Sequence, residues 1–219
     1  MFRPIVDTNK PVVLVGGAAL EPDDLNISRM LSAMFVAADS GADAILTAGF
    51  VPEAVIGDLD SISDTAREAF ADRLHLVAEQ DTTDFEKALC RINAPVIVAI
   101  GFMGGRLDHQ MAVLNVVMRF REKAVVLVGP EDVVFVAPTK TVLDLPVGTR
   151  VALLPMGDAR VDTDGLQWDI KDAALHPSSA ISAANASAAQ RVTIHAMGQL
   201  LITLPRDCLS VAIDVVRGQ

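Results

Sequence analysis

Residues 54–61 read Ala54-Val55-Ile56-Gly57-Asp58-Leu59-Asp60-Ser61, a short apolar run followed by two carboxylates two positions apart. Side chains alternate along a β-strand, so positions i and i+2 point the same way. Asp58 and Asp60 can therefore be directed at one point beyond the end of a buried strand. Close carboxylates repel each other unless a positive group lies between them, and Mg²⁺ prefers oxygen ligands of this kind. A merely solvated acidic pair is the alternative, and the rest of the chain has to decide between the two.

The composition describes a chain with enough apolar residues for a sizeable core. Its 219 residues are 51% hydrophobic, which suits one large domain or two small ones. No apolar run reaches the roughly 18 residues that a membrane span needs, and the N-terminus lacks the apolar segment of a signal peptide. We therefore expect a soluble cytoplasmic protein.

The charge is negative and unevenly distributed. A net charge of −10 argues against non-specific binding of nucleic acid. Residues 39–84 contain eleven Asp or Glu but only two basic residues, Arg67 and Arg73. Such a cluster can simply favour solubility, but it is also what a site for metal-bound phosphates requires.

The N-terminal part alternates continuous apolar runs with helical patterns. Fully apolar strands are typical of parallel sheets that are covered on both faces. Several runs end in glycine-rich or acidic loops, and ligands of open α/β sheets bind beyond the carboxyl ends of the strands. The expected strands cover residues 11–15, 34–38, 54–56, 74–78, 94–100 and 124–129.

A helix is expected to begin near Thr83, because Thr83 and Glu86 have the spacing of a capping box. Asp84 falls in the first turn, where the helix dipole favours a carboxylate whether or not it has a further role. Lys87 lies one turn further along, where it can either approach a phosphate or be solvated. Asp81 precedes the cap, and capping does not explain it.

The stretch from Gly101 to His109 contains Gly104-Gly105-Arg106 before a predicted helix. Free backbone N–H groups and the helix dipole make such a helix start a phosphate site, and the forked guanidinium of Arg106 suits phosphate oxygens. The stretch matches neither the Walker pattern nor the dinucleotide fingerprint. Asp108 and His109 lie in the first turn, and His109 can equally be structural.

The pattern changes near Pro130. Short strand-like runs, separated by Gly, Pro or Asp at 8–12-residue spacing, predict a small β-sandwich or barrel. We therefore expect an α/β domain with a parallel sheet over residues 1–131 and an all-β sandwich or barrel over residues 132–219, with residues 178–190 as a loop. The expected C-terminal strands cover residues 133–136, 141–145, 150–154, 191–196, 200–204 and 209–216.

Four motifs occur in order along the first domain: Asp39-Ser40-Gly41-Ala42-Asp43 and the stretches 57–61, 81–89 and 104–109. Together they closely resemble the thiamin pyrophosphokinase (thiamin diphosphokinase) family. Gly165-Leu166-Gln167-Trp168 and Ser182-Ala183-Ala184-Asn185 are similar, more loosely, to that family's Gly-Leu-Lys-Trp and Ser-Thr-Ser-Asn segments. The resemblance extends over most of the chain.

The resemblance implies a Rossmann-like α/β domain with a parallel sheet over residues 1–131 and a β-sandwich domain over residues 132–219. It also implies a diphosphotransferase that acts as a homodimer with active sites at the interface. It implies transfer of the diphosphoryl group of ATP to the hydroxyethyl oxygen of thiamin, which yields thiamin diphosphate and AMP. Three carboxylates match the family's Mg²⁺ ligands, namely Asp58, Asp60 and Asp84.

The resemblance also assigns residues to the two substrates. On the nucleotide and phosphate side it implies Asp39, Gly41, Asp81, Thr83, Lys87, Gly104, Gly105, Arg106, Asp108 and His109. On the thiamin side, contributed by the partner subunit, it implies Trp168, Ser182 and Asn185. Two positions depart from the family pattern, Ala184 in place of a serine and Ala186 in place of a polar residue.

Several alternatives remain open from the sequence. The acceptor can be another alcohol, such as a hydroxymethylpterin, or the chain can be a non-catalytic thiamin or nucleotide sensor or a metal-dependent phosphohydrolase. Either Asp81 or Asp108 can accept the proton of the attacking alcohol. Trp168 can stack on the cationic thiamin or anchor the core of the sandwich.

Overall fold

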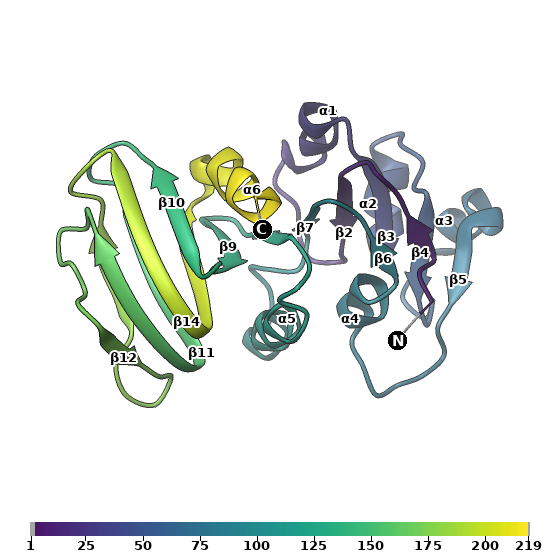
Figure 1. Cartoon of the computed structure of the whole chain (residues 1–219). Coiled ribbons are helices and arrows are strands. Elements are labelled where there is room, and N and C mark those ends of the chain that lie inside the picture. Colours follow the sequence, from purple (N-terminus) through teal and green to yellow (C-terminus); the bar gives the residue numbers. More distant parts are fainter. Residues whose placement is uncertain (1–2, 219) are drawn as a thin grey trace. The chain divides into compact units, whose positions relative to one another are not determined.

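The computed structural model describes residues 3–218. The chain is mixed α/β, with a large mixed sheet and a C-terminal β domain (Figure 1). It divides into two compact units, the first of residues 1–116 with 127–130 and the second of residues 117–126 with 131–219. No helix among the described residues is both long and apolar enough to cross a membrane.

The first unit is built on five parallel strands in the order β7-β2-β3-β4-β5. Every residue of β2, β4 and β7 is buried, which explains why their sequences are continuously apolar instead of alternating. Their carboxyl ends lie at one edge of the sheet. The strands are β2 (Val12–Val15), β3 (Met34–Ala38), β4 (Ala54–Gly57), β5 (Leu74–Leu76) and β7 (Ile97–Ile100).

Short helices follow these strands, and two of them begin with side-chain caps. The hydroxyls of Ser63 and Thr83 accept hydrogen bonds from the backbone N–H groups of Ala66 and Glu86, so the cap expected at Thr83 is confirmed. The helix α2 contacts β2 and β3, and α4 contacts β3 and β4 (Figure 1). The α-helices are α1 (Ile27–Leu31), α2 (Gly41–Thr47), α3 (Asp64–Ala69), α4 (Asp84–Leu89) and α5 (Leu107–Arg119).

Smaller elements complete this part of the chain. The first described strand, β1 (Val6–Asp7), pairs in parallel with β6 (Ile92–Asn93) and lies outside the main sheet. The 3-10 turns η1 (Asp24–Asn26) and η2 (Ala71–Arg73) precede α1 and β5. The strand β8 (Val125–Val128) lies where the two units divide.

Two fifteen-residue antiparallel strands, β11 (Arg150–Asp164) and β14 (Arg191–Pro205), form the centre of the second unit. One part of β14 pairs with β10 (Lys140–Asp144), and the other part pairs with β9 (Asp132–Val136). In the same way β11 pairs with β13 (Ser182–Ala186) and β12 (Ala173–Leu175) along different parts of its length.

Long strands replace several of the short ones that the sequence predicts. The runs 191–196 and 200–204 belong to one strand, β14, because Gly198 does not end it. Gly198 has a φ of 102°, and a Cβ atom there would lie 2.1 Å from the Asp158 carbonyl oxygen. This glycine therefore marks an irregularity within a strand pair, where β11 and β14 shift register.

Two further expectations about the C-terminal part are wrong. Residues 209–216 form no strand, because α6 (Leu209–Arg217) is a helix that packs against β9 and β10. Its buried residues, Ala212, Ile213 and Val216, have helical spacing, so packing overrides the strand preference of valine. The second unit is therefore not all-β. The expected loop 178–190 contains β13, whose small residues gave no strand signal.

Adjacent valines in α6 provide a test of this assignment. Val216 is 2% exposed, whereas Val215 is only partly buried, as the helical face of α6 requires. Val216→Ala should lower the free energy of unfolding by about 2 kcal/mol, from lost burial and the cavity left behind. Val215→Ala should lower it by less than about 1 kcal/mol. Urea denaturation measures both, and a larger loss at Val215 would contradict the buried face of α6, which contains Ala212, Ile213 and Val216.

Candidate active site

The acidic residues predicted from the sequence gather at the carboxyl edge of the first unit's sheet. Asp39 directly follows β3, Asp58 and Asp60 follow β4, and Asp84 begins α4. Oxygen atoms from Asp39, Asp58 and Asp60 lie within 4.8 Å of one another. Three carboxylates at this distance repel each other unless a cation lies among them.

The environment of the Asp39 carboxylate favours binding of a metal ion. Its side chain is 2% exposed, and Oδ2 accepts a hydrogen bond from the Ser61 N–H at 3.3 Å. Oδ1 is buried and has no hydrogen-bond partner among the described residues, a costly state for a carboxylate oxygen. Burial raises the pKa of Asp39. A hard divalent cation would satisfy this oxygen together with those of Asp58 and Asp60, so the residues fit Mg²⁺.

Asp84 makes a different contact. Its Oδ1 accepts a hydrogen bond from Lys87 Nζ at 3.1 Å, and the same ammonium donates to Asp58 Oδ2 at 2.8 Å. Lys87 is 2% exposed, which excludes a solvated helix lysine. Its hydrogen bond is the main reason that the pKa of Asp58 is lowered. Burial acts to lower the pKa of Lys87, but the bonds to Asp58 and Asp84 outweigh it and the pKa is raised.

The loop between β5 and α4 adds contacts that the sequence did not predict. Gln80 donates to Asp58 Oδ2 at 3.0 Å, so this oxygen has two donors. The Glu79 carboxylate accepts from the Asp81 and Thr82 N–H groups at 2.9 and 3.1 Å and fixes the backbone of the loop. Asp81 itself is exposed. No motif distinguishes Gln80 or Glu79 from ordinary loop residues.

Glycines allow the loops to come together. A Cβ atom on Gly57 would lie 3.0 Å from the Asp39 Cβ atom and 3.3 Å from Asp84 Oδ1. A Cβ atom on Gly41 would lie 2.0 Å from the Val15 carbonyl oxygen. At these positions a side chain would push the site apart.

A pocket of about 430 Å³ adjoins the carboxylates and is bounded by the loops after β2, β3, β4 and β7. Phe85 and Phe102 form part of its wall, with ring centroids 4.7 Å apart. Phe102 was not predicted from the sequence, although it lies inside the Gly101–His109 stretch. The predicted residues that line the pocket are Asp39, Thr83, Asp84, Gly105, Arg106 and His109.

Arg106 and Asp108 are paired with each other. The Arg106 Nε and Nη2 atoms donate to the two Asp108 oxygens at 3.1 and 2.5 Å. This pairing lowers the pKa of Asp108, so Asp108 is a weak proton acceptor while the pair persists. Gly104, which precedes them, has a φ of 86°, a value that suits glycine.

The predicted thiamin residues lie together within the second unit. Trp168 is 64% exposed, whereas Asn185 is 5% exposed. Asn185 Oδ1 accepts from the Trp168 N–H at 3.2 Å, and Asn185 Nδ2 donates to the Trp168 carbonyl at 2.8 Å. Both residues and Ser182 line a largely apolar pocket of about 510 Å³. The exposure of Trp168 excludes a core anchor.

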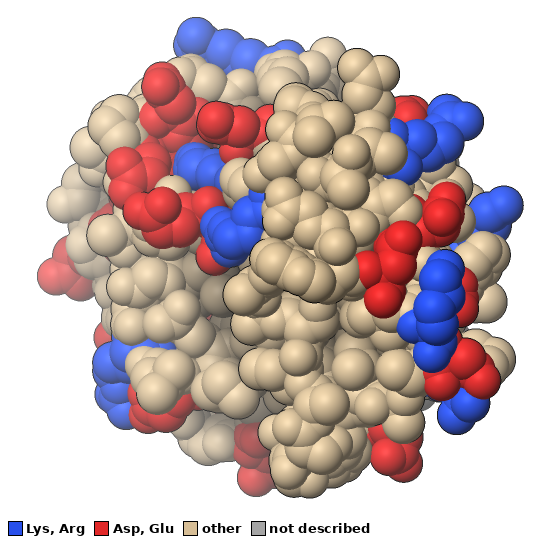
Figure 2. Space-filling model, turned by 90° about the vertical axis from the view of Figure 1, so that its left-hand side faces the viewer, with Lys and Arg blue, Asp and Glu red and all other residues tan. Residues whose placement is uncertain are grey.

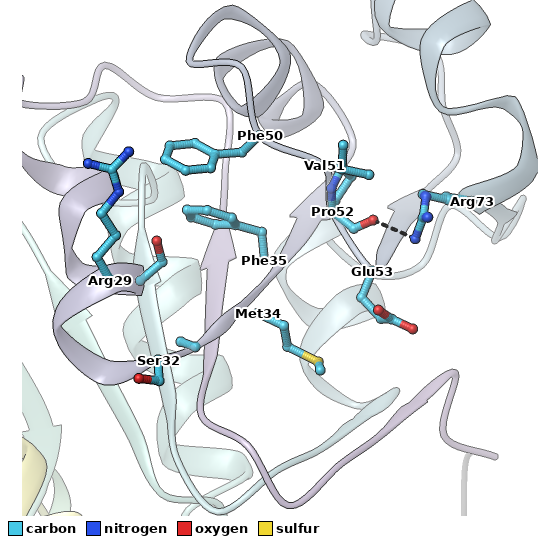
Figure 3. A pocket seen from close by; sticks show the side chains of 11 residues that line it. Arg29, Ser32, Met34, Phe35, Phe50, Val51, Pro52, Glu53 and Arg73 are labelled. Atoms are coloured by element: carbon cyan, nitrogen blue, oxygen red, sulfur yellow. Dashed lines mark hydrogen bonds between the residues drawn. The ribbon is translucent and has the colours of Figure 1, made fainter.

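Another pocket of the first unit, of about 720 Å³, contains none of the predicted site residues. It lies where β3 and β4 begin, opposite their carboxyl ends. Figure 3 shows Arg29 beside Phe50, and Arg73 donating to the Pro52 carbonyl oxygen at 3.1 Å. This pocket is larger than the one beside the carboxylates, but the absence of predicted site residues argues against its being the reaction site.

Surface charge gives little indication of a polyanionic partner on the face that Figure 2 draws. There Lys and Arg side chains lie beside Asp and Glu side chains, with a broad uncharged band between the charged groups. Exposed ion pairs are also common in the second unit, where Arg160 pairs with Asp172 and Arg191 with Asp144.

Two family models match the chain in succession. The model described as "Thiamin pyrophosphokinase, catalytic domain" matches residues 30–128, and the model described as "Thiamin pyrophosphokinase, vitamin B1 binding domain" matches residues 140–201. Thiamine pyrophosphokinase 1 of Oryza sativa subsp. japonica is 29% identical over 178 residues, which cover 71% of this chain and 66% of the relative. The chain thus spans just under two thirds of that relative's length.

Two bacterial proteins are also similar. Thiamine pyrophosphokinase of Bacillus subtilis (strain 168) is 36% identical over 83 residues, which cover 35% of this chain and 39% of the relative. The crystal structure of thiamin pyrophosphokinase from Geobacillus thermodenitrificans superposes with a TM-score of 0.76 at 24% identity, covering 89% of this chain and 96% of that one. The superposition supports the fold.

Lys87→Met should destabilise the protein by about 2–3 kcal/mol at pH 7, because it leaves Asp58 and Asp84 without their cation. This is less than for a fully buried pair, because the Asp84 side chain is 36% exposed. The pKa of Asp58 is lower in the folded protein than in the unfolded chain. Asp58 therefore stabilises the fold at pH values above its unfolded pKa of about 3.9, and this contribution is lost as the pH falls through its folded pKa.

The difference in the free energy of unfolding between wild type and Lys87→Met should therefore be largest near pH 7 and decrease below about pH 4. Urea denaturation at several pH values measures it. Lys171→Met is the control. The exposed Lys171 Nζ lies 3.8 Å from Asp162 Oδ1 and donates to the Thr163 carbonyl oxygen at 2.8 Å, so its loss should cost no more than about 1 kcal/mol. Equal losses for the two variants would contradict the role of Lys87.

Proposed function

The chain belongs to the thiamin pyrophosphokinase family, and we propose that it transfers the diphosphoryl group of ATP to the hydroxyethyl oxygen of thiamin, releasing AMP. The observation that carries this proposal is the tandem match of a catalytic model over residues 30–128 and a vitamin B1 binding model over residues 140–201. A phosphohydrolase would need no second unit of this kind, and a thiamin or nucleotide sensor would have little need of three converging carboxylates beside Lys87 and Arg106.

We propose that Asp39, Asp58 and Asp60 hold Mg²⁺. The unpartnered Asp39 oxygen and the proximity of the three carboxylates support this set. Asp84, which the sequence pattern includes among the ligands, contacts Lys87 and thereby holds the ammonium at the edge of the metal site. When bound, the ion would neutralise charge on the phosphate oxygens.

The chain's own residues orient the nucleotide. The backbone at Gly105 and the start of α5 can receive phosphate oxygens, while Phe85 and Phe102 offer an apolar wall of the pocket. Lys87 and Arg106 supply positive charge on the phosphate side. Phosphoryl-type transfer requires mainly such positioning and charge neutralisation from the protein.

The reaction exchanges one bond to phosphorus for another. The hydroxyl oxygen of thiamin attacks the β-phosphorus of ATP, and the bond from that phosphorus to the oxygen bridging to the α-phosphate breaks, so AMP leaves. A carboxylate accepts the hydroxyl proton. Asp81 suits this role better than Asp108, because Arg106 occupies both oxygens of Asp108.

The second unit is proposed to bind thiamin as a β-sandwich domain, while the first serves as a Rossmann-like nucleotide domain. The exposed indole of Trp168 can stack on a cationic aromatic ring, and Ser182 offers a hydroxyl in the same pocket. Asn185 fixes the backbone of Trp168. We propose that a homodimer assembles each complete site, with the thiamin pocket contributed by the partner subunit.

The primary test is a reaction of the purified protein with Mg-ATP and thiamin, analysed by chromatography. AMP and thiamin diphosphate should form together, and a hydroxymethylpterin should not replace thiamin. Asp58→Asn should lower turnover about 100-fold or more, whereas the exposed Asp72→Asn should retain it. Formation of ADP, or no product beside an active control enzyme, would exclude the proposal.

Trp168→Ala should raise the KM for thiamin about tenfold, through the loss of about 1.4 kcal/mol of stacking, and leave the KM for ATP unchanged. Met197→Ala is the matched control, because Met197 is an apolar side chain of the second unit that is also 64% exposed. At thiamin concentrations well below the raised KM, mixing Trp168→Ala with Asp58→Asn subunits should recover activity if the sites are shared. No recovery after proven subunit exchange would contradict the shared site.

A further inference from the structure

The turn that carries Asp58 and Asp60 has an unusual backbone. Leu59, between the two carboxylates, has a φ of 63°, in the left-handed region that residues other than glycine rarely adopt. Its side chain is 6% exposed, so it cannot turn outward to relieve the conformation. Such a conformation persists only when the surrounding structure holds it.

Side chains from the neighbouring helices α2 and α3 stabilise this conformation through hydrogen bonds. Arg67 on α3 donates a hydrogen bond from Nη2 to the carbonyl oxygen of Leu59. Asp43 on α2 accepts from both the N–H and the hydroxyl of Ser63, the N–H at 3.2 Å. Ser63 also caps α3, the helix that carries Arg67. The turn is thereby attached at residue 59 through Arg67 and at residue 63 through Asp43.

Asp60 depends on this attachment more than Asp58 does. Lys87 and Gln80 fix the side chain of Asp58. Asp60 is exposed, and its carboxylate accepts only from the hydroxyl of the adjacent Ser61 in the described hydrogen bonds, at 2.8 Å. Its position therefore follows the backbone of the turn, while repulsion from two nearby carboxylates acts to move it away.

We propose that Arg67 and Asp43 are positioning residues that hold the turn so that Asp58 and Asp60 converge with Asp39 on a divalent cation. The proposal rests on the proposed function only in taking this cation to be the Mg²⁺ of that reaction. Arg67 acts through the backbone carbonyl of Leu59, without a described contact to any of the three carboxylates. Its loss should therefore weaken metal binding before it alters chemistry.

The competing interpretation is that Arg67 merely stabilises the first unit, and Arg73 offers the matched control. Arg73 also donates a guanidinium hydrogen bond to a backbone carbonyl, that of Pro52 at 3.1 Å. It does so in the pocket of Figure 3, where β3 and β4 begin and where Asp39, Asp58 and Asp60 are not among the lining residues. A general stabilising effect should be similar in both variants, whereas an effect on metal binding should be confined to Arg67.

The experiment measures Mn²⁺ binding to wild type, Arg67→Met and Arg73→Met by electron paramagnetic resonance, without nucleotide, and thermal unfolding of each protein. Arg67→Met should raise the Kd for Mn²⁺ about 10-fold or more, as for other residues that orient metal ligands, and Arg73→Met should leave it within about twofold. In the diphosphoryl-transfer assay, excess Mg²⁺ should restore the turnover of Arg67→Met. Equal Mn²⁺ affinity of the two variants would overturn the proposal.

Asp43→Asn provides a second approach if Arg67→Met does not fold. It is nearly isosteric, disturbs the same turn through Ser63, and should also raise the Kd for Mn²⁺, while the exposed Asp72→Asn should not. Unchanged affinity in Asp43→Asn would overturn the proposal as well. A wild-type protein that binds Mn²⁺ but makes no thiamin diphosphate would refute the proposed function, and the variants would still decide the role of Arg67.

Discussion

The acidic edge of the first unit depends on one buried ammonium group. Desolvating the Lys87 charge is unfavourable unless partners compensate for it, and Asp58 and Asp84 do so at 2.8 and 3.1 Å. These carboxylates come from different segments, so the bonds tie the start of α4 to the end of β4. The Thr83 cap and the buried ring of Phe85 fix α4 in the same position. Charge compensation and helix packing therefore impose the same arrangement on this edge.

The two carboxylate oxygens of Asp58 have different surroundings. Oδ2 accepts from Lys87 and Gln80. Among the described residues, Oδ1 accepts only a long hydrogen bond of 3.4 Å from the Asp60 N–H. The lysine thus fixes the carboxylate without using all of its capacity to bind a cation. The remaining negative charge, shared with Asp39 and Asp60, is what a divalent ion would neutralise. A metal site and a fixed cation can therefore lie side by side.

Prediction from the sequence succeeds where local pattern determines the outcome. The apolar runs before Gly16, Asp39 and Gly57 are strands of the first sheet, and Thr83 caps the next helix. The burial of Lys87 and the contact of Gln80 with Asp58 could not be predicted, because each depends on distances between loops that follow different strands. The sequence predicts a strand over residues 209–216 because their valines favour one, whereas packing against β9 and β10 selects the helix α6.

The backbone of Trp168 is held in place although its indole ring is exposed. Asn185 is 5% exposed and forms hydrogen bonds with both the N–H and the carbonyl of Trp168, so the backbone that carries the indole is fixed. Leaving 64% of a tryptophan in water forgoes hydrophobic stabilisation. The lost stabilisation is recovered only when a ligand covers the indole. A cationic aromatic ligand can do this, because it stacks on the ring and its charge is attracted to the face of the ring.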